Sequence, residues 1–397
     1  MKSFRKIVVC ISALLVAISV RAQTLDEFLQ QQQQAQQQFA QNYLKGVAES
    51  AQAYEAYKKK WDDEFAQFRQ EQMARWGDFK ERSKKVWVEY KDGGKTCTSV
   101  DFESGKGRVE VIAESPAEVA QARNEMAQKL LDTFQAKPTE QGFEPKDTSI
   151  ENRPVSEDAA LENQIATAGR SAEAIAESLA DEAVKTKTVT GTDGKDRTVV
   201  YVDFSLAPNH ISTRAEKVQD YVYKHAKVHK LDPALVFAII HSESYYNPTA
   251  KSHANAHGLM QLVPTSGGRD AYRAAFKKDG IPTPEFLYVP DNNVRLGSTY
   301  FEILNSRYFK SAKSTEIRDY LAICAYNTGA GNVARAYTGT TSVSKAMKKI
   351  NGMSAQQNYD FLIKNLPYDE TKGYLKKVHE RRQMYAKWIK NPSNGIQ

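Results

Sequence analysis

The chain has 397 residues, 41% of them hydrophobic and 26% charged, which is typical of a globular protein long enough for two or three domains. Its three cysteines are too few for a disulfide scaffold, which excludes the small disulfide-rich class. The formal net charge of +7 favours a polyanion as partner, but nucleic acid, an anionic membrane surface and an acidic glycan fit it equally.

The N-terminus has the pattern of a secretory signal peptide. Basic residues precede an apolar stretch at 7–20, and "VRA" at 20–22 matches the small-x-small rule for cleavage. The stretch is too short to span a bilayer comfortably, and no later segment is apolar enough to do so. We therefore expect residues 1–22 to be removed and the protein to be exported to the periplasm. Association with the outer membrane stays open, although Cys10 does not lie in a lipoprotein processing site.

Cleavage would leave two cysteines, Cys97 and Cys324. They could pair across domains, but two buried small hydrophobic residues are the favoured interpretation. No cysteine cluster in the sequence suits a metal.

Residues 24–83 predict a long helix. "TLDE" at 24–27 is a capping box, and a Gln-rich stretch follows it. Aromatic residues then recur at helical spacing, at Tyr54, Tyr57, Trp61, Phe65, Phe68, Trp76 and Phe79. This stripe could dock on a membrane or an envelope protein, but packing on its own domain is the favoured interpretation for an amphipathic helix.

The next segments alternate apolar and polar residues with a period of two, which predicts strands separated by glycine-containing turns. Strands are expected at 86–90, 96–102, 108–113, 187–190 and 197–206. Helices are expected at 116–136 and 157–183. We therefore predict that residues 23–206 form an α+β domain with an antiparallel sheet and long helices.

After a boundary at 207–213, helical patterns dominate and no clear strand is predicted. Helices are expected at 212–229, 233–244, 267–278, 291–309, 315–326, 332–337 and 371–389. Residues 207–397 are therefore predicted to form an all-α domain.

The helix at 233–244 ends in an ionisable residue. Asp232 and Pro233 are good N-cap and first-turn residues, and "ALVFAII" is apolar on nearly every side, which is typical of a buried helix. Glu243 extends the apolar stripe of this helix by three-and-four spacing. Asn247-Pro248 then forces the chain out of helical geometry. We expect the Glu243 carboxyl at the floor of a pocket, half out of water.

Desolvation disfavours a charged carboxyl and raises its pKa, so Glu243 could stay protonated and act as a general acid. The alternative is a structural carboxyl, exposed at the helix end or paired with a lysine such as Lys251. The helix by itself does not decide between them.

Three further segments change that balance. "HGLMQLVPTSGG" at 257–268 follows Glu243 closely, "AICAYNTGAGNVARAY" at 322–337 is a helix that ends in a Gly-rich loop, and "LPYDETKGYLKKV" begins at Leu366. Each segment alone could be explained by helix packing, turns or caps.

In this order the segments resemble the soluble lytic transglycosylases. The matching positions are Glu243-Ser244 with Asn247-Pro248, Gly258-Leu259-Met260-Gln261, Ala325-Tyr326-Asn327 with Gly329, Gly331 and Asn332-Val333, and Leu366-Pro367 with Glu370-Thr371 and Tyr374. The resemblance covers about 210–389. Residues 86–113, residues 197–217 and the insert after Pro264 are similar to the membrane-bound lytic murein transglycosylase C subfamily. That subfamily is typically lipidated on an N-terminal cysteine, and no such cysteine follows the apolar segment here.

The resemblance implies a goose-type lysozyme-like fold and cleavage of the β-1,4 bond between N-acetylmuramic acid and N-acetylglucosamine without water. It implies that Glu243 is the sole catalytic carboxyl, first as acid and then as base toward the C6 hydroxyl, which closes a 1,6-anhydro ring. No cofactor or metal is implied, and peptidoglycan strands are the expected partner. The implied substrate-binding residues are Ser252, Gly258, Met260, Gln261, Ala325, Tyr326, Asn327 and Tyr374.

Other function classes stay open. A lysozyme-type hydrolase on the same fold needs a second carboxylate, for which Asp270 and Asp291 are candidates. A non-catalytic glycan-binding envelope protein could use the same fold without cutting. No nucleic-acid motif is found.

A zinc enzyme is a further class, since His241, Glu243, His253 and His257 lie close in sequence. No His-Glu-x-x-His motif is present, and the His-x-Glu triplet lacks the Cys-x-x-Cys partner of the zinc deaminases. Three convergent ligands are normally required.

Overall fold

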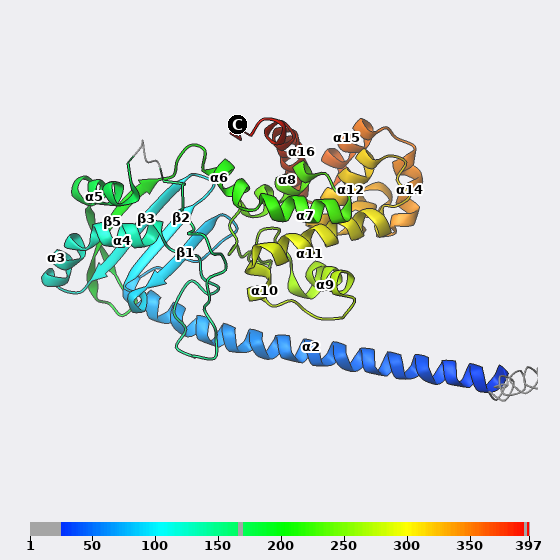
Figure 1. The fold of residues 1–397 in the computed structure, drawn as a ribbon, viewed down its shortest axis with the longest axis horizontal. Helices are drawn as coiled ribbons and strands as arrows, with labels where there is room; N and C mark the ends of the chain where they lie inside the picture. The colour runs from blue at the N-terminus through cyan, green and yellow to red at the C-terminus, as the bar shows by residue number, and fades with distance from the viewer. Residues whose placement is uncertain (1–24, 166–169, 393–394, 397) are drawn as a thin grey trace, which may run out of the picture. The chain divides into compact units, whose positions relative to one another are not determined.

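The structure is a computed structural model that describes residues 25–165, 170–392 and 395–396, so the expected signal peptide lies outside the described residues. The chain forms two compact units, Met1–Ala53 and Tyr54–Gln397. Helix α2 (Leu25–Trp76) runs through the boundary between them. The account below concerns the second unit, which contains both the sheet and the helical part (Figure 1).

Helix α2 ends at Trp76 rather than near Ser83, so its predicted end is wrong. Gly77 stops it, because its φ is +73° and a Cβ there would lie 2.2 Å from the Thr190 carbonyl oxygen. A side chain is therefore excluded by conformation and by contact.

The aromatic stripe of α2 packs on its own unit, which was the favoured interpretation. Phe65, Phe68, Trp76 and Phe79 join a cluster with Tyr90 on one face of the sheet. The rings meet closely, as in the stacked pair of Phe79 and Tyr90, whose centroids are 5.5 Å apart. The rings of the stripe are thus buried or half-buried on their own unit.

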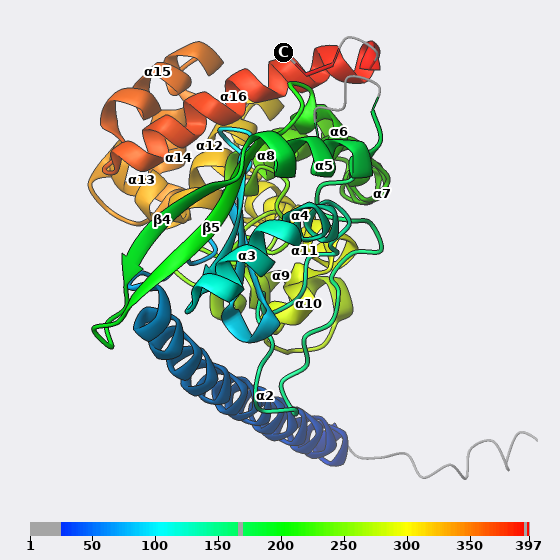
Figure 2. The same ribbon diagram turned by 90° about the vertical axis from the view of Figure 1, so that its left-hand side faces the viewer.

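The predicted hairpins form one antiparallel sheet of five strands in the order β1-β2-β3-β5-β4. The strands are β1 (Val86–Lys91), β2 (Thr96–Asp101), β3 (Lys106–Ala113), β4 (Lys185–Thr190) and β5 (Asp196–Ser205). Side chains alternate between two apolar faces. The face that contains Trp87, Val100 and Val109 lies under helices α3 (Pro116–Asn124), α4 (Met126–Phe134) and α5 (Ala172–Glu182) (Figure 2), and the opposite face lies under α2.

Two helix predictions in this part need correction. The segment 116–136 forms two helices, α3 (Pro116–Asn124) and α4 (Met126–Phe134), which are divided at Glu125 (φ −90°, ψ −2°). The prediction at 157–183 is wrong over 157–165, since helix α5 covers only Ala172–Glu182. Asn163 has a left-handed φ of 57°, and Ile165 instead bridges to Leu206 beside the sheet.

After residue 206 the described residues form no strand, only helices and isolated bridges, as predicted. The helices are α6 (His210–Lys217), α7 (Gln219–His229), α8 (Pro233–Ser244), α9 (Arg269–Phe276), α10 (Pro284–Tyr288), α11 (Pro290–Ile303), α12 (Thr315–Thr328), α13 (Ala330–Thr338), α14 (Val343–Asn351), α15 (Ala355–Asn365) and α16 (Asp369–Lys390). The single helix expected at 212–229 is divided into α6 and α7 at Val218. Helices α10, α14 and α15 were not predicted, although α15 begins with a capping box of Ser354 and Gln357.

Helix α8 is the centre of the helical part, as its apolar sequence predicted. Its residues from Ala234 to Ile240 are all at most 2% exposed, and α16 packs along it through Tyr385 and Trp388. The fold class is thus confirmed as α+β followed by all-α, while the exact boundary at 206–207 stays a prediction.

The two cysteines of the described chain, Cys97 and Cys324, are buried and unpaired. They lie in the sheet and in α12, where they act as small hydrophobic residues, as predicted. Burial raises the pKa of the Cys97 thiol to about 12. Among the described residues, no helix is long and apolar enough to cross a bilayer.

Candidate active site

The C-terminal end of α8 places Glu243 in the interior. Asp232 caps the helix by accepting from the Ala234 N–H at 2.9 Å, and the helix ends at Ser244 because Tyr245 and Tyr246 have left-handed φ angles of 50° and 60°. Glu243 is 5% exposed. Burial raises the pKa of its carboxyl, which is the direction expected for a general acid and one of the two interpretations that the helix left open.

A lysine contacts this carboxyl, but it is not Lys251, the example named in the alternative interpretation. The Lys84 ammonium lies 3.4 Å from Glu243 Oε2, and its charge lowers the pKa of Glu243 against the larger effect of burial. Lys251 instead lies over the Trp61 ring, with its Nζ 3.9 Å from the centroid. Lys84 stands before β1, far from Glu243 in sequence, so no local pattern pointed to it.

Two arginines of α16 fix the position of α8. Arg381 donates to Ser242 Oγ at 3.0 Å and to the Tyr245 hydroxyl at 2.9 Å. Arg382 donates to the capping carboxylate of Asp232 at 2.7 Å. Both ends of α8 are therefore held by side chains of one neighbouring helix.

A third arginine holds the strained turn after Glu243. The buried Arg214 guanidinium donates to the carbonyl oxygens of Tyr245 at 2.9 Å and Tyr246 at 2.6 Å, and to Gln164 Oε1 at 3.0 Å. It stacks on the Phe102 ring at 3.4 Å from the centroid. Its burial lowers the pKa of Arg214 to about 9.

The segment 258–261 is held against the site by Asn293, a residue that the sequence motifs did not single out. Asn293 Oδ1 accepts from the Met260 N–H at 2.7 Å, and its amide nitrogen donates to the carbonyl oxygens of His257 and Leu287 at 3.0 and 2.6 Å. Gly258 has φ +78°, and a Cβ there would lie 2.1 Å from Asn293 Nδ2. The Met260 side chain is fully buried.

Gln261 has one free acceptor. Its amide nitrogen donates to the carbonyl oxygens of Ala250 at 3.1 Å and Gly258 at 2.9 Å. Its Oε1 is buried and has no hydrogen-bond partner among the described residues. An unpartnered buried acceptor is costly, and a donor on a ligand would satisfy it.

Helix α12 brings the third motif to the same place. The Tyr326 hydroxyl donates to the Met260 carbonyl oxygen at 2.8 Å, and the Glu243 charge contributes to raising the pKa of Tyr326. Asn327 Oδ1 accepts from the Thr371 hydroxyl at 2.7 Å, which ties α12 to the start of α16. Ala325 is buried within α12.

Tyr374 and Ser252 complete the predicted set. Tyr374 is buried beside the Glu243 carboxyl, and burial together with the Glu243 charge raises the pKa of its hydroxyl. Ser252 lies on the loop after α8, where its hydroxyl accepts from the Ala256 N–H at 3.0 Å. The structure therefore groups Tyr326 and Tyr374 around Glu243, while Ser252 is engaged within its own loop.

Asp270 and Asp291, the two carboxyls considered as the second carboxylate of a hydrolase, have environments unlike that of the buried Glu243. Asp291 lies 2.6 Å from His225 Nε2 and also pairs with Lys224, whereas Asp270 is exposed. The negative charge of Glu370, an exposed residue, weakly raises the pKa of Glu243.

The zinc ligands considered above do not converge. His241 Nδ1 lies 3.0 Å from the Tyr385 hydroxyl, and His257 Nδ1 lies 3.0 Å from the Tyr288 hydroxyl. In the part of the chain that the structure describes, no three His, Cys, Asp or Glu residues are grouped so as to hold a metal ion.

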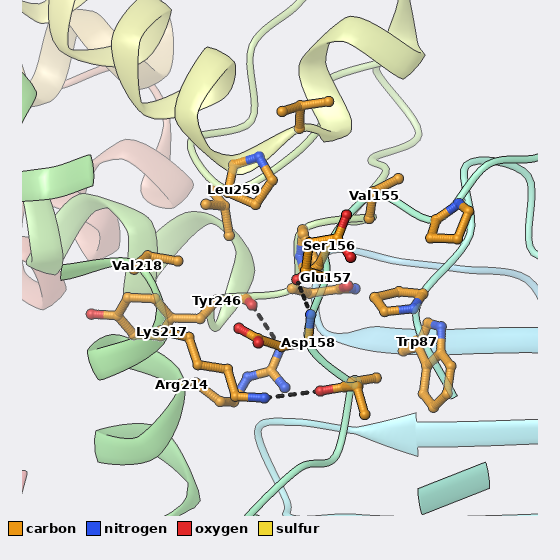
Figure 3. A pocket seen from close by; sticks show the side chains of 18 of the residues that line it. Trp87, Val155, Ser156, Glu157, Asp158, Arg214, Lys217, Val218, Tyr246 and Leu259 are labelled. Carbon is orange, nitrogen blue, oxygen red and sulfur yellow. Dashed lines mark hydrogen bonds between the residues drawn. The ribbon is translucent and has the colours of Figure 1, made fainter. Parts of the chain in front are cut away.

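A separate cavity of about 370 Å³ lies next to the loop that follows α8. Figure 3 shows Trp87 of the sheet on one side and Val218 and Leu259 of the helical part on the other. Glu243 is not among the residues that line this cavity, whereas Arg214, which binds the turn after α8, is one of them. This cavity is therefore distinct from the group around Glu243.

Replacing Tyr326 by phenylalanine tests the link between α12 and the segment 258–261. The change leaves the buried Met260 carbonyl oxygen without its donor, so we expect a loss of about 1–2 kcal/mol in the free energy of unfolding. Urea denaturation of the full chain measures it, and the exposed Tyr223→Phe is the control. An equal, negligible change in both variants would contradict the importance of this bond.

Sequence comparison finds relatives for both parts of the second unit. Residues 220–349 match the family "Transglycosylase SLT domain", and residues 54–217 match "Membrane-bound lytic murein transglycosylase C, N-terminal domain". A protein of Salmonella arizonae named membrane-bound lytic murein transglycosylase C is 32% identical over 306 residues, covering 76% of this chain and 82% of its own. A protein of the same name from Actinobacillus pleuropneumoniae serotype 5b is 33% identical over 310 residues, covering 76% of this chain and 80% of its own.

Among solved structures, an inactive mutant of the lytic transglycosylase Slt from Pseudomonas aeruginosa aligns with a TM-score of 0.34 and 26% identity. The alignment covers 43% of this chain and 24% of that one. The SLT match falls on the helical part, where a lysozyme-like fold was predicted.

Proposed function

Because the chain belongs to the membrane-bound lytic murein transglycosylase C family, and is therefore an enzyme of peptidoglycan cleavage, we propose that it cuts the β-1,4 bond between N-acetylmuramic acid and N-acetylglucosamine and leaves 1,6-anhydro ends. The observation that carries this proposal is the buried Glu243, whose desolvated carboxyl has a raised pKa. A carboxyl whose pKa is raised keeps its proton to a higher pH than an exposed one, and it can donate that proton to a glycosidic oxygen.

One carboxyl serves twice in the proposed reaction. Glu243 first protonates the glycosidic oxygen as the C1–O bond breaks, while the muramoyl N-acetyl group assists at C1. The leaving sugar then departs, and the Glu243 carboxylate takes the proton of the C6 hydroxyl. That oxygen closes on C1, which forms the anhydro ring and returns Glu243 to its acid form without adding water.

The remaining residues are proposed to shape the sugar site. Gln261 Oε1 suits an N–H or O–H of a sugar, since it is buried and unpartnered among the described residues. Asn327 would contribute its amide nitrogen, and the rings of Tyr326 and Tyr374 would flank the muramoyl residue. Gly258 would let the segment 258–261 pack closely on Asn293, Ala325 would pack inside α12, Met260 would support Tyr326 through its carbonyl oxygen, and Ser252 would bind an acetamido group.

Product analysis separates this proposal from hydrolysis. Purified sacculi are digested in water enriched in oxygen-18, and the muropeptides are examined by mass spectrometry beside a digest made with a hydrolytic muramidase. We expect anhydro ends without oxygen-18 from this protein, because the C6 oxygen replaces water. Reducing ends that carry one oxygen-18 would identify a hydrolase instead.

The proposal includes an envelope location, in keeping with a peptidoglycan substrate. Export and cleavage after residue 22 stay predictions, since those residues lie outside the described part of the chain. Association of the N-terminal domain with a membrane or an envelope protein is likewise a prediction.

A further inference from the structure

The turn that joins α2 to β1 reaches the buried carboxyl of α8. Lys84 Nζ lies 3.4 Å from Glu243 Oε2, and Asn247 Nδ2 lies 3.5 Å from the Ser83 carbonyl oxygen, at hydrogen-bonding distance. Residues 83 and 84 fall in the part matched by the N-terminal family model, and Glu243 falls in the part matched by the SLT model. The sheet domain therefore supplies a cation to the site of the helical domain.

The turn is built to hold this position. Ser83 Oγ accepts from the Val86 N–H at 3.1 Å, and the Ser83 N–H donates to the Val86 carbonyl oxygen at 3.0 Å. The Lys85 carbonyl oxygen accepts from the Phe102 N–H at 2.9 Å in the adjoining strand.

The residue before the turn anchors it from the other side. Arg82 donates to the carbonyl oxygens of Val88, Glu140 and Thr139 at 3.1, 2.9 and 2.8 Å. The backbone that carries Lys84 is thus fixed before any substrate binds, which is the property of a group that acts by position.

Resting on the proposed function, we propose that Lys84 is a positioning residue whose ammonium stabilises the carboxylate that Glu243 becomes between the two proton transfers. Lys84 takes no part in either proton transfer, so the proton count of the reaction is unchanged. A buried carboxylate without a partner is strongly disfavoured, and a cation at this distance offsets part of that cost.

Lys84 is placed so that it neutralises the charge of the Glu243 carboxylate in part rather than completely. Its side chain is 36% exposed, so water screens its charge, whereas the Glu243 side chain is 6% exposed. The other titratable groups coupled to Glu243 are Tyr374 and Glu370 of α16 and Tyr326 of α12. Burial raises the pKa of Glu243, so the acid form is present before the first proton transfer. Lys84 lowers that pKa in part, so Glu243 can still give up its proton.

The test compares Lys84→Met and Lys84→Gln, which remove the charge, with Lys84→Arg, which keeps it. Lys95→Met is the control, since Lys95 lies in the same domain and pairs with Glu118 at 3.3 Å. The full chain is assayed on a purified glycan of alternating N-acetylglucosamine and N-acetylmuramic acid, with kcat and kcat/KM measured against pH. Melting temperatures establish that each variant is folded.

For the neutral variants we expect kcat to fall roughly tenfold and the alkaline limb of kcat/KM to move upward by about one pH unit. The sign follows from the removed cation: without Lys84 the pKa of Glu243 rises further, so its acid form persists to higher pH but donates its proton less readily. Lys84→Arg should restore both values, and Lys95→Met should match the wild type.

An unchanged pH profile in both neutral variants would overturn the proposal. A fall in kcat that Lys84→Arg does not rescue, with the alkaline limb in place, would also overturn it by assigning Lys84 a merely structural role. Neither outcome touches the function proposed for Glu243, which is tested separately by replacing that residue.

Discussion

Replacing Glu243 by glutamine is expected to lower kcat by roughly a thousandfold or more on purified sacculi, because the amide has no proton to donate and cannot take one back. The side chain is buried at the end of α8. The exposed Glu380→Gln on α16 is the matched control and should retain wild-type activity.

The fold should survive this change. Burial already favours the neutral form of Glu243, and glutamine has the same shape, so we expect a melting temperature within a few degrees of the wild type. The wild-type kcat/KM should fall as the pH rises through the raised pKa of Glu243, since only the acid form can donate. The residual kcat/KM of the variant should not show this fall with rising pH. Release of anhydro products by the variant at the wild-type rate would refute the role of Glu243.

Replacing Gly258 by alanine is expected to cost about 3 kcal/mol or more in the free energy of unfolding. The left-handed φ of +78° alone costs about 1–2 kcal/mol for a residue with a Cβ. The new methyl group would also lie 2.1 Å from Asn293 Nδ2 and 2.2 Å from the Leu287 carbonyl oxygen. Relief of these contacts would displace Asn293 from Met260, which loosens the segment beside Glu243.

Gly194→Ala separates the two causes. Gly194 has nearly the same φ, +76°, but no atom lies within 4 Å of the position that its Cβ would occupy. We expect only the conformational cost there, about 1–2 kcal/mol. Urea denaturation of both variants measures the difference in the free energy of unfolding. Equal losses would show that Asn293 and Leu287 move away from the new methyl group without loss of stability.

Local patterns in the sequence predicted the elements that depend on neighbouring residues. Asp232-Pro233 and the apolar run after them placed α8 between its observed ends, and glycine-containing turns placed the hairpins of the sheet. The position of Glu243 on an apolar stripe indicated a carboxyl withdrawn from water, and the structure buries it and raises its pKa. These features follow from periodicity, capping and turn chemistry, which act over a few residues.

Predictions were wrong where a distant contact decides the local structure. Helix α2 stops at Gly77 because the backbone of Thr190, at the end of β4, leaves no room for a side chain at residue 77. Residues 157–165 have a composition that permits a helix, but they run beside the sheet and pair Ile165 with Leu206. Tertiary packing overrides a weak propensity in such places.

The chemistry of the candidate site divides in the same way. The sequence by itself determined that a carboxyl ends a buried helix and that the motifs of one enzyme family follow it in order. Only the tertiary structure decided what surrounds that carboxyl: Lys84, which is 159 residues away in the chain, and Asn293, which orders the segment 258–261. The reason is that a charge or a hydrogen bond acts through space over a few ångströms, and the distance along the chain carries no information about it.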